Sequence, residues 1–133
     1  MITAKLIDVG RPTVNGRIYS QKVLEDALAH WEAHFKTKTM PIFKDATATP
    51  QITDIVGYAE NFRFEDGYLV ADIGFLKERM GDVGEEGETI NVRPNGSGKI
   101  NPETGVVEEG YRMVGLCIRR NPVVGATIKY EKE

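Results

Sequence analysis

The sequence predicts a single α+β domain, in which one main amphipathic helix packs on a curved, mostly antiparallel β-sheet or partly closed β-barrel. Three observations support this fold class. Short runs of apolar residues, or of alternating apolar and polar residues, are bounded by glycine, proline and asparagine, which is typical of strands. One long segment, residues 20–36, repeats apolar residues at helical spacing. The length of 133 residues fits one domain with a modest core, and no linker or internal repeat divides residues 1–133.

The first half of the chain predicts a strand, a turn, the helix and a second strand. Residues 2–9 alternate apolar and polar side chains, as a half-buried strand does, and Asn15-Gly16 then favours a turn. Ser20 is suited to cap a helix of about four turns. Residues 40–43 predict a short buried strand, followed by a loop over 45–51. The apolar stripe of the helix consists of Leu24, Ala27, Leu28, Trp31 and Phe35.

The second half predicts further strands and a long polar excursion. Residues 52–64 and 68–75 form an expected hairpin around the tight turn Asp66-Gly67. One helical turn is expected over 76–80, because the glycines that follow weaken a longer helix. Dense turn-forming residues predict a protruding polar loop region over about 81–110. Three more strands are expected, over residues 89–92, 111–118 and 123–130.

Charge and cysteine content exclude several classes of function. Twenty acidic and seventeen basic residues give a net charge of −3, which provides no long-range attraction for nucleic acid or an anionic membrane. We therefore expect neither as a partner. The opening residues contain no apolar stretch suited to a signal peptide or membrane span. The single cysteine, Cys117, cannot form an intrachain disulfide, so synthesis in a reducing cytoplasm is expected.

Three motifs resemble ligand sites without meeting their requirements, so we expect no metal and no cofactor. His30 and His34 are four residues apart, a spacing that can place two imidazoles on one metal, but they fall on the flank or back of the apolar stripe. Gly96-Ser97-Gly98-Lys99 resembles the end of a phosphate-binding loop, yet Ile100 stands where a hydroxyl is required. The acidic run over 82–88 lacks the alternating spacing of a calcium loop.

Cys117 is the one nucleophile candidate whose neighbours could alter its chemistry. Arg119 and Arg120 follow it, and nearby cations lower the pKa of a thiol. In a strand, residues 117 and 119 share one face. Two alternatives stay open: a reactive thiolate beside arginine, or a small buried core residue.

Several segments carry a family resemblance through their order along the chain. The helix is preceded by Asn15-Gly16-Arg17-Ile18-Tyr19 and followed by three segments, residues 40–45, 55–59 and 66–69. A later strand, residues 114–120, ends in two arginines. The last strand, over 126–128, comes after Asn121-Pro122. This succession resembles the prohead proteases of tailed phages and the assemblin-like maturation proteases of herpesvirus capsids. The resemblance implies their fold, and it places Cys117 at the position of the nucleophilic serine.

The same resemblance implies that the catalytic groups are missing. The family activates its serine with a histidine, because a hydroxyl is a poor nucleophile until a base takes its proton. Here Cys117 replaces the serine, and the segment expected to bear the histidine reads Phe43-Lys44-Asp45-Ala46-Thr47. No histidine follows His34. We therefore expect a pseudoenzyme with no catalytic residues.

The expected function is that of a non-catalytic structural protein of the tailed-phage virion: a capsid decoration, cement or head-assembly component. The implied partners are the major capsid protein or other virion proteins, including further copies of the chain in the lattice. The implied location is the virion, after synthesis in the host cytoplasm. Protruding loops commonly carry binding. The expected capsid-contact residues are Asn95, Gly96, Lys99, Asn101 and Glu103.

Two alternatives belong to other functional classes. The first is an active prohead maturation protease that uses Cys117 as nucleophile and Asp45 or Asp54 as base. A carboxylate serves as a base near neutral pH only if its surroundings raise its pKa. The second is a bacterial binding module unrelated to phages, because a fold does not fix a function.

Overall fold

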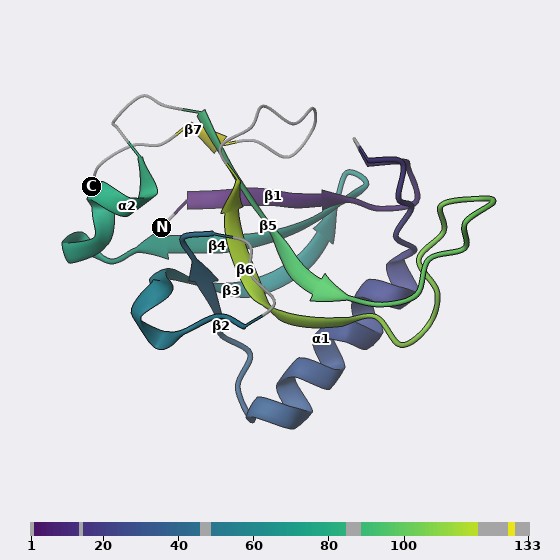
Figure 1. The fold of residues 1–133 in the computed structure, drawn as a ribbon, viewed down its shortest axis with the longest axis horizontal. Coiled ribbons are helices and arrows are strands. Elements are labelled where there is room, and N and C mark those ends of the chain that lie inside the picture. Colours follow the sequence, from purple (N-terminus) through teal and green to yellow (C-terminus); the bar gives the residue numbers. More distant parts are fainter. Residues whose placement is uncertain (1, 14, 46–48, 85–88, 120–127, 130–133) are drawn as a thin grey trace.

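The computed structural model describes residues 2–13, 15–45, 49–84, 89–119 and 128–129. In this part of the chain, seven strands form one sheet in the order β1-β4-β3-β2-β6-β5-β7. Only β2 and β6 pair in parallel among the described strands (Figure 1). The predicted α+β class is confirmed. The strands are β1 (Ile2–Asp8), β2 (Met40–Phe43), β3 (Ile55–Glu65), β4 (Tyr68–Phe75), β5 (Thr89–Ser97), β6 (Arg112–Arg119) and β7 (Ile128–Lys129).

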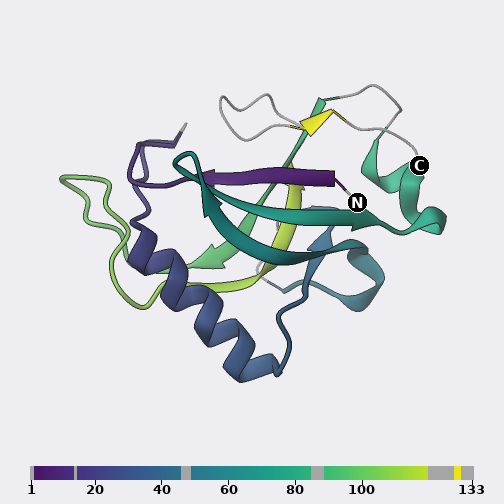
Figure 2. The same cartoon turned by 180° about the vertical axis from the view of Figure 1, so that it is seen from behind.

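Helix α1 (Gln21–Phe35) forms where the apolar stripe predicts it. The Ser20 side-chain oxygen accepts a hydrogen bond from the Val23 backbone N–H at 3.1 Å, which satisfies one free donor of the first turn. The indole N–H of Trp31 donates to the Thr39 carbonyl at 3.1 Å and so ties the helix to the segment before β2. Seen from behind, α1 runs obliquely beside the curled sheet (Figure 2). Its buried residues are Val23, Leu24, Ala27 and Trp31.

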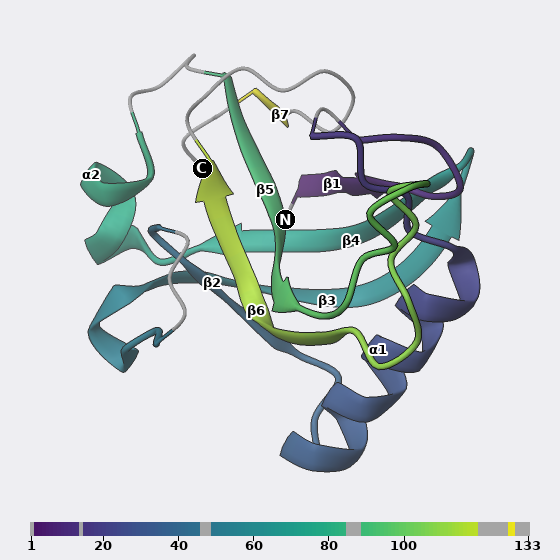
Figure 3. The same ribbon diagram turned by 45° about the vertical axis from the view of Figure 1, so that its right-hand side comes forward.

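The sheet curls into a half-closed barrel. Figure 3 shows β5 and β6 crossing the direction of β1, β4 and β3. β1 and β5 contact each other, although no ladder of hydrogen bonds joins them in the described part of the chain. Register shifts interrupt four of the strand pairs, and such bulges increase local twist. The concave face is filled by side chains that include Leu6, Leu24, Met40, Ile42, Leu69, Ile73 and Leu116.

The hairpin predicted at Asp66-Gly67 is confirmed. Asp66 has φ 51° and Gly67 has φ 80°, the two positive values that a tight hairpin turn of the favoured hand requires. β3 enters the hairpin after a short 3₁₀ turn, η1 (Ile52–Asp54). The helical turn expected after β4 consists of η2 (Lys77–Arg79) and α2 (Met80–Val83).

The loop region predicted over 81–110 is only partly a loop. β5 continues to Ser97, five residues beyond the predicted strand end at 92, and pairs with β6 as far as Arg112. Asn95 and Gly96 are therefore strand residues and not loop residues. Pro94 lies within this ladder opposite Leu116, although proline has no N–H to donate to a neighbouring strand. The projecting segment is the connection between β5 and β6, residues 98–111 (Figure 1).

Two further expectations concern the rest of the chain. Of the strand predicted over 123–130, the structure describes β7 alone, and the remaining residues lie outside the described part. Across the described residues, no helix has the length and apolar character needed to cross a membrane.

Candidate functional site

Cys117 lies on β6, at the centre of a row of side chains that crosses three strands. Its register partners are Phe43 on β2 and Arg93 on β5. Directly paired residues share a face, so these three side chains project from the same side of the sheet. Cys117 is 0% exposed and Phe43 is 6% exposed. Of the two alternatives for this cysteine, the structure therefore favours the buried residue over the accessible one.

The Phe43 ring occupies the space next to the candidate nucleophile. A Cβ atom placed on Gly115, two residues before Cys117, would lie 2.6 Å from a ring carbon of Phe43. Gly115 also has φ +141°, which other residues rarely adopt. The parallel pairing of β2 and β6 thus brings the segment expected to carry the family's histidine beside Cys117, and it presents an aromatic ring there.

Burial raises the pKa of the Cys117 thiol above its usual value of 9.0. The charge of Arg119 and its hydrogen bond to the thiol act in the opposite direction, as does the charge of Arg93, but the effect of burial is larger. Asp45 adds a negative charge that further opposes thiolate formation. The thiol is therefore held in its protonated, weakly nucleophilic form.

The two candidate bases have different surroundings. Asp54 forms an ion pair with Lys44 at 3.7 Å, and its Oδ2 accepts a hydrogen bond from the Gln51 backbone N–H at 3.2 Å. It closes the turn of η1. Asp45 is exposed, and its charge acts on Cys117, but in the direction that disfavours ionisation of the thiol.

The remaining motifs of the sequence are distributed over other elements. His30 and His34 stack on exposed positions of α1, with ring centroids 5.7 Å apart. Within the described residues, no group of three or more histidine, cysteine, aspartate or glutamate side chains is placed to hold a metal ion. Asp82 pairs with Arg79 at 3.0 Å, whereas the rest of the acidic run, from 85 to 88, lies outside the described part, as does Arg120.

The candidate capsid-contact residues divide into two groups. Asn95 and Gly96 belong to β5, and a Cβ on Gly96 would lie 2.6 Å from the hydroxyl oxygen of Tyr111. Lys99, Asn101 and Glu103 lie in the projecting loop. Asn101 is structural, because its Oδ1 accepts backbone N–H groups of Glu103 at 2.9 Å and Thr104 at 3.3 Å. Lys99 and Glu103 are exposed and free to contact another molecule.

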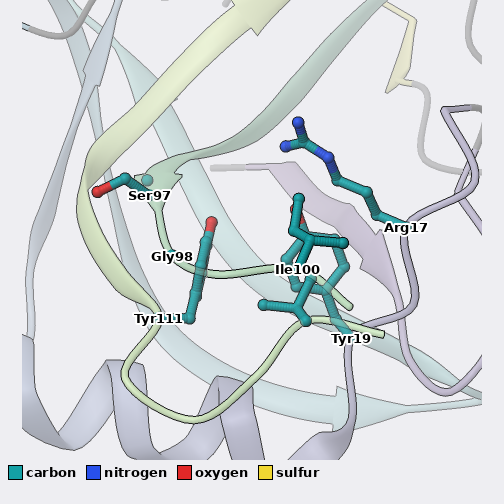
Figure 4. A pocket seen from close by; sticks show the side chains of 8 residues that line it. Arg17, Tyr19, Ser97, Gly98, Ile100 and Tyr111 are labelled. Atoms are coloured by element: carbon teal, nitrogen blue, oxygen red, sulfur yellow. The ribbon is translucent and has the colours of Figure 1, made fainter. Parts of the chain in front are cut away.

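At the base of this loop lies a pocket of about 200 Å³ that no motif of the sequence indicates. Two distant segments build it. Backbone hydrogen bonds of 2.9 Å join Ile18 N–H to the Gly105 carbonyl and Val107 N–H to the Ile18 carbonyl. Figure 4 shows Ile100 between Tyr111 and Arg17. The pocket is lined by Arg17, Tyr19, Gly96, Ser97, Gly98, Ile100, Val107 and Tyr111.

The two tyrosines form the inner wall of this pocket. Their ring centroids are 5.3 Å apart in an edge-to-face arrangement. Burial, followed by the neighbouring Tyr19, raises the pKa of Tyr111 well above its usual value of 10.0, so the phenol stays neutral. Arg17 and Tyr19 belong to the Asn15–Tyr19 segment that carries the family resemblance, but nothing in sequence spacing indicates that Tyr111 lies against them.

The fold is similar to that of a known capsid enzyme. No protein-family model matches the chain, and neither does any curated protein. Among solved structures, the bacteriophage T4 capsid assembly protease, gp21, superposes with a TM-score of 0.67 at 13% sequence identity. The match covers 88% of this chain and 79% of gp21. The prohead-protease-like fold expected from the resemblance is thereby supported.

Proposed function

We propose that this chain is a non-catalytic head protein of a tailed phage, which uses a prohead-protease-like fold to bind the capsid. The observation that carries the proposal is the state of the nucleophile position. Cys117 is fully buried and protonated beside the ring of Phe43, on a fold shared with a capsid assembly protease. A protease needs an accessible nucleophile and a base within hydrogen-bond reach.

The proposed partners are the major capsid protein or other virion proteins, and the proposed location is the virion. The loop over 98–111 supports this assignment because it projects from the body of the domain and carries the exposed charges of Lys99 and Glu103 (Figure 1). Such charges at the rim of an interface contribute mainly to orientation and association rate. In a lattice, neighbouring copies of the chain are further proposed partners.

The experiment combines the chain with its major capsid and scaffold proteins and follows two readouts. Cleavage of the partners is measured by intact mass, with wild-type protein and the Cys117→Ala variant. Association with assembled particles is measured by co-sedimentation. We expect no cleavage that depends on Cys117, and association that both proteins share. Partner cleavage that disappears with Cys117→Ala would overturn the proposal in favour of the cysteine protease.

A charge reversal tests the loop as the contact surface. Lys99→Glu should weaken co-sedimentation, whereas the matched reversal Lys38→Glu should not. Lys38 lies after α1, is 80% exposed at its side chain, and makes only a 4.0 Å pair with Glu32. Equal association of the two variants would show that the loop is not the contact.

A further inference from the structure

We infer that the pocket at the base of the loop binds a carboxylate carried by a peptide, with Arg17 as its cationic partner. The inference goes beyond the proposed capsid role, because it assigns a ligand chemistry to a site that does not involve Cys117. If the chain does bind the capsid, this pocket would hold one anchoring side chain of the partner.

The size of the cavity limits the ligand. Sites for cofactors and drug-sized molecules usually measure about 300–1,000 Å³. A cavity of about 200 Å³ is smaller than these and suits a single side chain. Binding energy at protein interfaces is concentrated in a few residues that fill such pockets. A short acidic side chain presented by an extended peptide is therefore an appropriate occupant.

The charge of the lining selects an anion. Arg17 is its only charged residue and is exposed, and it forms no ion pair with any residue of the described part. A guanidinium presents paired N–H donors whose spacing matches a carboxylate. In Figure 4 the Arg17 guanidinium and the Tyr111 hydroxyl point toward the same side of the pocket, whereas the Ser97 hydroxyl points away from both.

The apolar part of the lining suits the stem of a glutamate. Ile100 and Val107 supply aliphatic contacts, and the faces of Tyr19 and Tyr111 close the inner side. Methylene groups would lie against this surface while the carboxylate reaches Arg17 at the opening. The frame is preformed: Gly98 lets the loop backbone pack closely on Tyr111, since a Cβ there would lie 3.0 Å from the Tyr111 Cα.

The test uses the full chain and three short blocked peptides, observed by ¹H–¹⁵N NMR. The probes are acetyl-Ala-Glu-Ala-amide, the same peptide with glutamine, and acetyl-Ala-Ala-Ala with a free carboxyl terminus. We expect the glutamate peptide to shift the signals of Gly98, Ser97 and the Arg17 side chain with a Kd of about 1 mM, typical of one anchor. The glutamine peptide should bind about tenfold more weakly. The third probe distinguishes a terminal carboxylate from a side-chain one.

Arg17→Ala should weaken binding of the glutamate peptide about tenfold, and Lys38→Ala, which removes the same charge far from the pocket, should leave it unchanged. Because Arg17 is exposed, its removal is compatible with folding, and the dispersion of the NMR spectrum checks this directly. Equal binding of the glutamate and glutamine peptides, wild-type affinity in Arg17→Ala, or no shifts at about 20 mM peptide would each overturn the inference.

This outcome is separable from that of the proposed function. The peptide experiment uses no capsid, and the sedimentation experiment uses no peptide. Particle association without peptide binding would refute the carboxylate pocket and leave the head-protein role in place. Peptide binding without particle association would refute the head-protein role and leave the carboxylate pocket in place.

Discussion

Cys117 shows how the surroundings of one residue decide its chemistry. Its arginine neighbours alone would favour a thiolate, but removal from water disfavours the charged form more strongly. The pKa of the thiol is therefore raised. In a Cys117→Ser variant, the new hydroxyl would meet the same buried surroundings beside Phe43.

The first prediction is that Cys117 resists alkylation in the folded protein. Iodoacetamide at pH 8 should modify the unfolded chain in 6 M guanidinium at least about 100-fold faster, because the folded thiol is both inaccessible and protonated. Intact mass over time measures the two rates, and Cys117→Ala gives the background. Rapid labelling of the folded protein at the rate of the unfolded chain would contradict the burial on which the proposed function depends.

The Cys117 thiol also leads us to expect a loss of folding stability at alkaline pH. The folded-state pKa of the thiol lies above the unfolded value of 9.0, so its contribution to stability is complete below pH 9. That contribution declines as pH rises from there through the folded pKa. Urea unfolding at pH 8 and pH 10 should therefore show a larger loss for wild type than for Cys117→Ala. Equal losses would mean that the thiol ionises as readily in the folded state.

At the scale of single elements, local signals were sufficient for the helix and the hairpin. The Ser20 cap and the apolar stripe define α1, and Asp66-Gly67 defines the β3–β4 turn. The end of β5 was not predictable in this way. Pro94 and Gly96 are strand breakers by propensity, but pairing with β6 overrides that preference. The decisive partner lies about twenty residues away along the sequence, beyond the reach of local reasoning.

The close contact between β2 and β6 predicts that a side chain at Gly115 would destabilise the protein. Gly115→Ala should lower the free energy of unfolding by about 1–3 kcal/mol, because its backbone has φ +141° and the new Cβ would collide with the Phe43 ring. Gly81→Ala is the matched control, since its Cβ would meet nothing within 4 Å. It lies in α2 and should be neutral or up to about 1 kcal/mol stabilising. Similar values for the two variants in urea titrations would refute this packing.

Asp72 joins three strands, and its hydrogen bonds lead us to expect a loss of folding stability at acidic pH. Its carboxylate accepts hydrogen bonds from Thr3 on β1, at 2.9 Å, and from Asn61 on β3, at 3.0 Å, while Arg63 lies at 3.3 Å. The hydrogen bonds from Asn61 and Thr3 are the main causes that lower the pKa of Asp72 below its usual 3.8. The stabilisation is therefore present above pH 3.8 and is lost as pH falls through the folded pKa.

Asp72→Asn should consequently be less stable than wild type at pH 7, and the difference should shrink toward pH 2. The effect is modest because the network is exposed to solvent. Thermal unfolding across this pH range measures it. Asp66→Asn removes one charge outside the network and serves as the control. A deficit in Asp72→Asn that persists unchanged at pH 2 would indicate that lost packing, rather than the charge, is responsible.

For the whole molecule, the alternation of strands and one amphipathic helix was enough to predict the α+β class. The curl of the sheet was only partly predictable, because it depends on bulges at positions such as 42–43 and 95–96. A bulge is defined by the register between two paired strands, so the sequence of one strand alone does not indicate it. The candidate site shows the same limit. The sequence identifies Cys117, but the neighbouring Phe43 ring arises from parallel pairing of strands far apart in the chain. Likewise, the pocket joins Arg17 and Tyr111, whose proximity no spacing encodes.

The fate of this polypeptide during particle maturation distinguishes a head protein from a protease. Quantitative mass spectrometry of purified immature and mature particles would compare it with the major capsid protein. For a head protein we expect an intact chain at a fixed ratio to the major capsid protein in mature particles, unchanged by Cys117→Ala. A chain that is present only in immature particles and lost as its partners are trimmed, with trimming abolished by Cys117→Ala, would instead identify a protease.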